Sequence, residues 1–311
     1  MKSRRWWIGL ALVALFLSFS TSAIADEIVD EEVVDEDLVA EEFADEAAEA
    51  DDDGIGGLHH QSLLQIRATP VGLSLWSDTG YKFGLFDSEE LLFADTYVDA
   101  GITTALSPAF AWAGPYVEIL PLAVLNLRFS AQFMGYFGNF GYLYVPDDEA
   151  REWTLSALDE SADQGLGQAS TGLLLKAQAT PQMRVGRVVF QAESSFNWMR
   201  MDVEDQYYEP YFDLFFAPTD TFWMTRPTLG YLLGRDLSHS YLLLGARWER
   251  VAVNTTEVVR DTVGVVFNWK IPPTLMEWGD PAFSGFGGVF LNHPNRGQVS
   301  PYLGLQFIFQ F

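Results

Sequence analysis

The sequence predicts an all-β fold, a single antiparallel up-and-down sheet that closes into a barrel and spans a lipid bilayer. Three observations predict it. After an apolar N-terminal segment, no apolar run reaches the roughly 18 residues that a transmembrane helix needs. Aromatic residues make up 15% of the chain, which also contains 26 glycines. Apolar and polar residues alternate over long stretches, as they do in a β-strand whose two faces meet different surroundings.

The N-terminus has the pattern of a secretory signal peptide. A basic start at 2–5 precedes the apolar stretch 6–19, and the small residues of Ala23–Ile24–Ala25 fit a cleavage site. We therefore expect residues 1–25 to be removed on export. The chain contains no cysteine, which excludes disulfides, thiolate metal sites and a lipid anchor on cysteine. The sequence offers no metal site and indicates no cofactor.

Residues 26–58 form an acidic segment. Between 26 and 53 there are 16 acidic side chains and no basic one, out of 43 acidic residues in the whole chain. Repulsion between like charges favours an extended, disordered tail in the periplasm. The segment either keeps the protein soluble or docks on a basic periplasmic partner. Because the sequence has no basic patch, nucleic acid is excluded as a partner.

The body of the chain, residues 59–311, is predicted to be the barrel, with about twelve strands. An even number keeps both termini on one side of the membrane, and ten or fourteen strands remain alternatives. Pro115 and Pro227 fall inside strands, where each removes a ladder hydrogen bond unless a bulge accommodates it. The predicted strands are 68–76, 80–87, 93–106, 110–120, 125–138, 168–180, 184–200, 222–235, 239–252, 257–270, 282–292 and 299–311.

A soluble β-sandwich would also alternate, so the length and the ends of the strands decide between the two folds. Many predicted strands have about 12–15 residues, longer than the usual strand of a soluble sheet and long enough to cross a bilayer when tilted. Trp198, Trp248 and Trp269 lie near strand ends on the apolar face, where an aromatic girdle belongs. These features favour the membrane barrel.

Charged residues share the polar face of the strands. A shift of one residue would turn an arginine such as Arg128 towards lipid, at a cost of roughly 2–4 kcal/mol at the bilayer centre. We therefore expect the lumen to be lined by bases that outnumber acids. The expected lumen residues are Lys82, Asp95, Asp99, Glu118, Arg128, Lys176, Arg187, Glu193, Arg226, Arg247, Glu249, Arg260 and Lys270.

This lumen permits two functions. A basic wall can attract small, anionic solutes, so the first interpretation is a porin-like channel. The alternative is a non-conducting structural or surface-interaction barrel, in which salt bridges fill the lumen. The acidic segment 145–163 and the acidic, aromatic segment 201–221 are predicted outer loops, and they suit either a bound ligand or contacts with lipopolysaccharide.

The chain ends in "YLGLQFIFQF", in which Gly304 precedes Phe307, Phe309 and Phe311 at alternate positions. This ending resembles the C-terminal signature of Gram-negative outer-membrane β-barrel proteins. The resemblance implies that the barrel-assembly machinery recognises this strand, that the last strand closes against the first, and that the protein resides in the outer membrane with lipid and lipopolysaccharide around it.

Enzymes occur among such barrels, and the outer-membrane phospholipase type has serine two residues after histidine on one strand face. His239 and Ser240 are adjacent and point to opposite faces, and His293 lies in an expected outer turn. We expect His59 and His60, which precede the first predicted strand, to lie outside the barrel wall. A nucleophile needs its base within hydrogen-bond reach, so on this reading the sequence predicts no enzyme.

Overall fold

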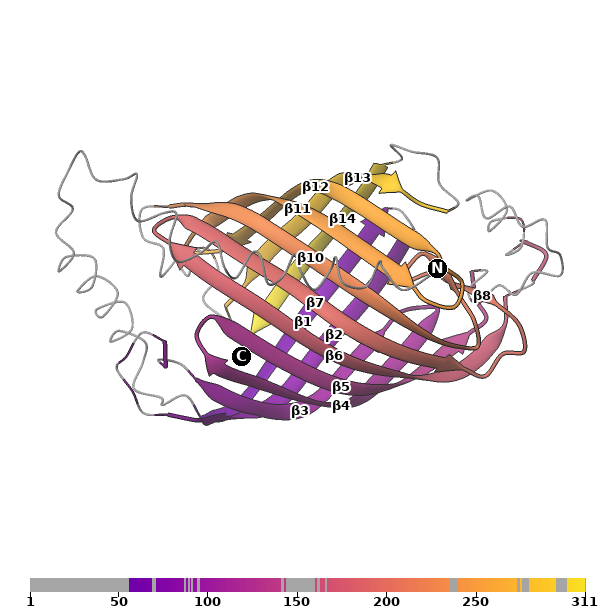
Figure 1. Ribbon diagram of the computed structural model, residues 1–311, viewed down its shortest axis with the longest axis horizontal. Helices are drawn as coiled ribbons and strands as arrows, with labels where there is room; N and C mark the ends of the chain where they lie inside the picture. Colours follow the sequence, from indigo (N-terminus) through magenta and orange to yellow (C-terminus); the bar gives the residue numbers. More distant parts are fainter. Residues whose placement is uncertain are drawn as a thin grey trace, which may run out of the picture. The chain divides into compact units, whose positions relative to one another are not determined.

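The computed structural model describes residues 56–68, 71–86, 88, 90, 92–93, 96–140, 143, 160, 163–165, 167–234, 240–272, 275, 280–294 and 301–310. These residues form a closed antiparallel barrel of twelve strands and a separate two-stranded sheet (Figure 1). The barrel strands are β1 (Gly57–Ala68), β2 (Val71–Gly84), β3 (Tyr97–Leu106), β4 (Phe110–Leu122), β5 (Leu125–Phe137), β6 (Ala169–Val185), β7 (Val188–Met201), β10 (Thr219–Leu233), β11 (Leu242–Val253), β12 (Val259–Lys270), β13 (Ala282–Asn292) and β14 (Pro301–Gln310). The small sheet consists of β8 (Tyr207–Glu209) and β9 (Leu214–Phe216).

The barrel closes where the first strand meets the last. β1 pairs with β14 in a ladder from Gln61 opposite Gln310 to Arg67 opposite Gly304. Every other barrel strand pairs with its neighbours in sequence, except that β7 pairs with β10 because β8 and β9 lie between them. Closure leaves no unpaired sheet edge within lipid, which a membrane barrel requires. The predicted fold class is confirmed.

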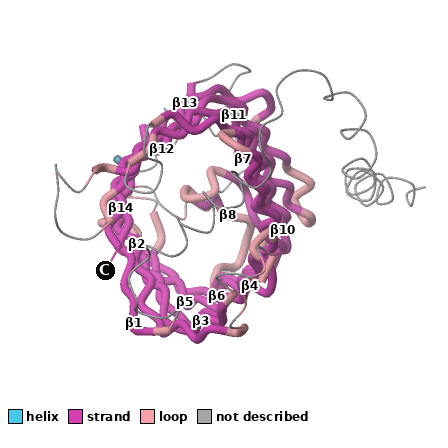
Figure 2. Tube along the Cα trace, turned by 90° about the vertical axis from the view of Figure 1, so that its left-hand side faces the viewer, coloured by secondary structure: helices cyan, strands magenta, loops and turns pink. Residues whose placement is uncertain are grey.

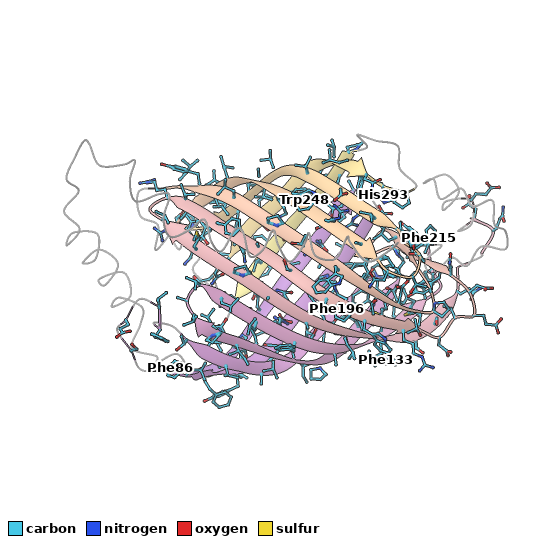
Figure 3. The ribbon with its side chains drawn as sticks, viewed as in Figure 1. Phe86, Phe133, Phe196, Phe215, Trp248 and His293 are labelled. Atoms are coloured by element: carbon cyan, nitrogen blue, oxygen red, sulfur yellow. The ribbon has the colours of Figure 1, made fainter. Side chains whose placement is uncertain are left out.

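The two ends of the barrel differ. β1 begins and β14 ends at one end, which we call the terminal rim; the other end, which we call the loop rim, carries the long connections 138–168 and 202–218. Figure 3 shows the two ends, with Phe86 at the terminal rim and Phe215 and His293 at the loop rim. The two-residue connections 123–124 and 186–187 lie at the terminal rim.

The first two strand predictions are wrong. The strands expected at 68–76 and 80–87 are replaced by the hairpin of β1 and β2, which starts at Gly57 inside the predicted acidic segment 26–58. On β1 the outward positions include His60 and Ser62, which break the apolar alternation and hide the strand. The other ten predicted strands overlap β3–β7 and β10–β14. The predicted signal peptide and most of the acidic segment lie outside the described residues.

Both prolines inside strands are accommodated without a bulge. The β4–β5 ladder skips Gly114 and Pro115 and resumes at Tyr116 opposite Ser130 in the same register. The β10–β11 ladder skips Pro227 in the same way, while Pro227 stays opposite Ala192 in the ladder with β7. Each proline therefore interrupts the pairing on one side only.

The strands alternate between a lumen face and an outer face. On β5, Phe129, Phe133 and Phe137 are 50%, 58% and 50% exposed, whereas Gln132 and Tyr136 are buried. Large, exposed apolar side chains cover the outer wall, as expected of a surface that meets hydrocarbon. Among the described residues, no helix is long and apolar enough to cross a membrane.

Candidate functional site

The lumen charges form ion pairs between strands, some of them neighbours and some on separate parts of the wall. Arg128 on β5 lies 2.8 Å from the carboxylate of Asp78 on β2 and 3.2 Å from that of Glu118 on β4. Its guanidinium also lies 4.1 Å from the ring centre of Tyr116. One predicted lumen base is thus shared between two acids. One of these is Asp78, which falls between the predicted strands 68–76 and 80–87 and was not among the predicted lumen residues.

A second network joins five strands. Arg226 on β10 lies 2.6 Å from Glu249 on β11 and 3.6 Å from Glu193 on β7. Glu193 also lies 3.4 Å from the Lys176 ammonium on β6, and Glu249 contacts Arg260 on β12. Charges that are largely withdrawn from water are retained only when they are paired in this way.

The remaining predicted lumen residues have different surroundings. Asp99 accepts a hydrogen bond of 3.0 Å from Tyr116 and lies 2.8 Å from His59, which places His59 within β1 and not before the barrel. Arg247 donates to Thr228 at 3.0 Å. Nearer the terminal rim, Lys82 lies over the Tyr97 ring and Lys270 ends β12. Asp95 lies outside the described residues.

The placement of Arg187 in the lumen is wrong. Arg187 is exposed in the 186–187 turn, and its guanidinium donates to the backbone carbonyls of Leu232 and Gly234 at 3.4 and 3.0 Å. Arg187 would face the lumen if the alternation of β7 extended to it, but the strand begins only at Val188. Arg187 therefore holds two terminal-rim connections together and does not line the lumen wall.

The segment between β7 and β10 folds back into the barrel. Figure 2, which looks along the barrel, shows β8 inside the ring of strands. We call residues 206–217, which contain β8 and β9, the plug hairpin. Tyr207, Leu214 and Phe216 are 0% exposed, and Phe212 packs on Phe222 of β10 with ring centres 4.7 Å apart. The sequence predicted an outer surface loop here, and this prediction is wrong.

Arginines from the wall hold the tip of the plug hairpin. Arg67 on β1 donates to the Tyr211 carbonyl at 2.7 Å and lies 4.7 Å from the centre of the Tyr211 ring. Arg260 on β12 donates to the Phe212 carbonyl and is itself buried. Arg67 is not among the predicted lumen residues, because it lies on β1, which the alternation pattern does not reveal. These contacts hold the tip of the hairpin against β1 and β12, which are separated by β13 and β14 in the ring of strands.

Two buried acids complete the docking. The Glu209 carboxylate accepts hydrogen bonds from the Tyr136 hydroxyl at 2.5 Å, the Phe212 N–H at 2.6 Å and the Tyr211 N–H at 3.0 Å. Burial raises the pKa of Glu209 above its ordinary value, and these hydrogen bonds oppose the rise. Asp213 lies 3.0 Å from His293, which follows β13, and both side chains are buried.

Two cavities lie beside the plug hairpin within the lumen. The larger, of about 370 Å³, is lined by residues that include Asp78, Arg128 and Glu193; the smaller, of about 260 Å³, is lined by residues that include Arg247. Tyr211 and Phe212 line both cavities. Two cavities with charged walls therefore flank the tip of the plug hairpin in the described part of the lumen.

The predicted girdle tryptophans all point away from the lumen. Trp248 and Trp269 are 36% and 37% exposed on the outer wall, and Trp198 is half-buried there. Trp269 lies near the terminal rim, opposite Phe283 of β13, whereas Trp248 lies at mid-strand opposite Val263. Of the C-terminal signature, Gly304, Phe307 and Phe309 lie on β14, and Phe311 lies outside the described residues.

The outer wall also carries a polar cluster on β1 and β2, which we call the outer polar cluster. His60 Nε2 lies 2.8 Å from Ser62 Oγ, and His60 Nδ1 lies 2.7 Å from Thr79 Oγ1. Ser62 Oγ lies 2.9 Å from Ser77 Oγ. The expectation that His60 lies outside the barrel is wrong. A serine does follow a histidine by two residues at 60–62, but β1, which places both side chains on one face, was not predicted.

A closed twelve-stranded barrel with an apolar exterior and a charged interior defines the class of this chain, an outer-membrane β-barrel protein. No protein-family model matches the sequence, and neither does any curated protein.

Solved structures resemble the fold at low sequence identity. The β domain of the Bordetella autotransporter BrkA has 12% identity and a TM-score of 0.46, over 82% of this chain and 99% of that one. LpxR from Salmonella typhimurium has 11% identity and a TM-score of 0.40, over 81% of this chain and 99% of that one. OmpT of Vibrio cholerae has 8% identity and a TM-score of 0.35, over 82% of this chain and 97% of that one.

Proposed function

We propose that this protein is a closed outer-membrane barrel in which the plug hairpin blocks the solute pathway. The observation that carries the proposal is the position of residues 206–217 inside the ring of strands, where Tyr207, Leu214 and Phe216 have no exposed surface. The hairpin is held from four strands or strand ends, through Arg67, Tyr136, Arg260 and His293 (the hydrogen bonds given above).

The charges of the wall support the same proposal. Free bases would attract anions, but Arg128, Arg226 and Arg260 each contact at least one carboxylate, and Lys176 contacts Glu193. Paired charges of this kind satisfy one another and present little net field to a passing ion. The resting protein is accordingly a filled barrel, the second of the two interpretations that the sequence permits.

Conduction by a porin-like route then requires the hairpin to leave. Its departure frees Arg67 and Arg260 from backbone carbonyls, and both guanidinium groups remain in the lumen. We propose that the unplugged barrel passes small anions in preference to cations, because the departing hairpin takes Glu209 and Asp213 out of the lumen while Arg67 and Arg260 stay on the wall.

A planar bilayer recording tests the proposal. The purified mature protein is expected to show no steady conductance, and a variant in which a short Gly-Ser linker replaces residues 206–217 is expected to conduct, with anion preference. Gel mobility with and without heating checks that both proteins are folded barrels. Steady conductance of the parent protein overturns the closed barrel; cation preference of the linker variant overturns only the anion route.

The partners proposed for the protein follow from its class. Outer-membrane phospholipid and lipopolysaccharide surround the apolar wall, and the barrel-assembly machinery recognises the last strand through Gly304, Phe307, Phe309 and Phe311. Replacing Phe309 with serine should lower the amount of folded protein in the outer membrane. An unchanged amount would count against recognition of this strand.

A further inference from the structure

We propose that His60, Ser62 and Thr79 form a nucleophilic site on the outer wall that cleaves acyl esters of membrane lipids. The three side chains lie in one row on the outer face of the β1–β2 hairpin, with Thr79 directly opposite His60 and Ser77 directly opposite Ser62. The site is separate from the lumen, because the side chains of all four residues occupy the outward-facing positions of their strands.

The geometry meets the requirement for an activated serine. The imidazole lies between two hydroxyl groups, at 2.8 Å from Ser62 Oγ and 2.7 Å from Thr79 Oγ1. When Nδ1 carries the proton and donates it to Thr79, the Nε2 lone pair is directed at the Ser62 hydroxyl. A base within hydrogen-bond reach of the nucleophile, oriented by a third group, is the arrangement that acyl-transfer enzymes use. Here the third group is a neutral hydroxyl.

The surroundings of the cluster indicate its substrate. The outer polar cluster places an imidazole on a wall that faces hydrocarbon, where an ionisable side chain is costly and usually marks a functional position. Tyr81 and Phe83, on the same face of β2 and nearer the terminal rim, are 46% and 55% exposed. Exposed aromatic rings at a barrel end mark the level of the lipid headgroups. The serine therefore lies just inside that level, where the acyl esters of lipids are found.

The reaction follows from the positions of the atoms. Ser62 Oγ attacks the ester carbonyl carbon as its proton passes to His60 Nε2, and the Ser77 hydroxyl, 2.9 Å from Ser62 Oγ, can donate to the developing oxyanion. The C–O bond to the lipid alcohol breaks, and the alcohol leaves with the proton from Nε2. Water then attacks the acyl-serine; it gives one proton through His60 back to Ser62 Oγ and releases the fatty acid.

The chain offers a matched control. On the outer wall between β7 and β10, Ser194 Oγ lies 2.9 Å from Thr225 Oγ1, a hydroxyl pair with the same separation as Ser62 and Ser77. The hydrogen bonds of the described residues give this pair no histidine partner. A serine that owes its reactivity to His60 should therefore react, whereas Ser194 should not.

Labelling with a fluorophosphonate probe tests the nucleophile. The folded mature protein in detergent micelles is expected to carry one adduct, located by mass spectrometry on Ser62. Ser62→Ala should abolish the adduct, His60→Gln should slow its formation by about a hundredfold, the scale of a lost general base, and Ser194→Ala should change nothing. Absence of an adduct on the folded parent protein, or an equal rate in His60→Gln, overturns the site.

A second measurement tests the substrate class. In vesicles of phosphatidylethanolamine and phosphatidylglycerol, the parent protein should release fatty acid, and Ser62→Ala, with unchanged heat-modifiable gel mobility, should not. Cleavage of a soluble nitrophenyl ester without release of fatty acid from the vesicles overturns the lipid substrate and leaves the nucleophile standing. Neither experiment depends on whether the lumen conducts, so a failure here does not bear on the closed barrel.

Discussion

Replacing Glu209 with alanine should loosen the plug hairpin without unfolding the barrel. The change removes the acceptor of three buried donors, the Tyr136 hydroxyl and the N–H groups of Tyr211 and Phe212. A buried donor without a partner costs about 1–3 kcal/mol. Because the variant also avoids the cost of burying a carboxylate, we expect a net loss of about 2–4 kcal/mol in the free energy of docking.

This loss competes with the apolar burial of the hairpin. Tyr207, Phe212, Leu214 and Phe216 are buried, and each contributes about 1.5–3 kcal/mol, or roughly 6–12 kcal/mol together. The hairpin should therefore stay docked most of the time. A loss of about 3 kcal/mol raises the undocked fraction by roughly a hundredfold, since about 1.4 kcal/mol corresponds to a factor of ten.

Single-channel recording is the assay, and brief openings are the expected result. Glu204→Ala is the control, because Glu204 lies in the same connection and is exposed. If the Glu209 variant stays as silent as the parent protein while the linker variant of 206–217 conducts, the hydrogen bonds of Glu209 do not hold the hairpin, and the reasoning is refuted.

Three further predictions concern pH, the ion pairs and the strand contacts. Because burial raises the pKa of Glu209 above its ordinary value of 4.5, the docked hairpin binds more protons than the undocked one. Docking is therefore strongest at low pH, and channel openings should become more frequent as the pH rises through the raised pKa. An opening rate that does not change with pH would contradict this prediction. Arg128→Ala leaves two carboxylates unpaired and should lower stability by about 2–4 kcal/mol in urea unfolding followed by tryptophan fluorescence, whereas Arg187→Ala, at an exposed turn, should change it by less than about 1 kcal/mol; equal shifts would show that the Arg128 pairs contribute little. A Cβ on Gly114 would lie 1.8 Å from the Ala131 carbonyl oxygen, so Gly114→Ala should reduce the folded yield on heat-shift gels, while Gly287→Ala, whose nearest contact is 3.8 Å, should not; equal yields would mean that β4 and β5 separate at little cost.

The wall of the barrel could be predicted from sequence because its rule is local. Alternation with a period of two fixes which side of a strand faces lipid, and an arginine such as Arg128 or Arg247 fixes the register, since a slip would turn it into hydrocarbon. The alternation rule failed at β1 because it depends on the residues of that strand alone. His60 and Ser62 occupy outward positions that lipid-facing strands fill with apolar residues, so the alternation broke where a separate function is now proposed.

The plug hairpin could not be predicted in this way. Its acidic and aromatic residues have the composition of a surface loop, and nothing in their spacing shows that they turn inward. The partners that hold them, Tyr136 for Glu209 and His293 for Asp213, lie 73 and 80 residues away in sequence. Contacts between residues so far apart in sequence arise only when the barrel closes, and a single sequence gives no signal for them.

The origin of the hairpin's contacts sets an order of events during biogenesis. The hairpin is synthesised before β12, β13 and β14, yet it is held by Arg260 and His293 from that later part of the chain, and by Arg67, whose strand is fixed only once β1 and β14 have joined. Until β1 and β14 have paired, the plug hairpin lacks some of the wall contacts that hold it in the lumen. The complete set of contacts that holds the plug hairpin can therefore form only once β1 and β14 have paired, so the closed barrel that we propose is completed at the end of insertion.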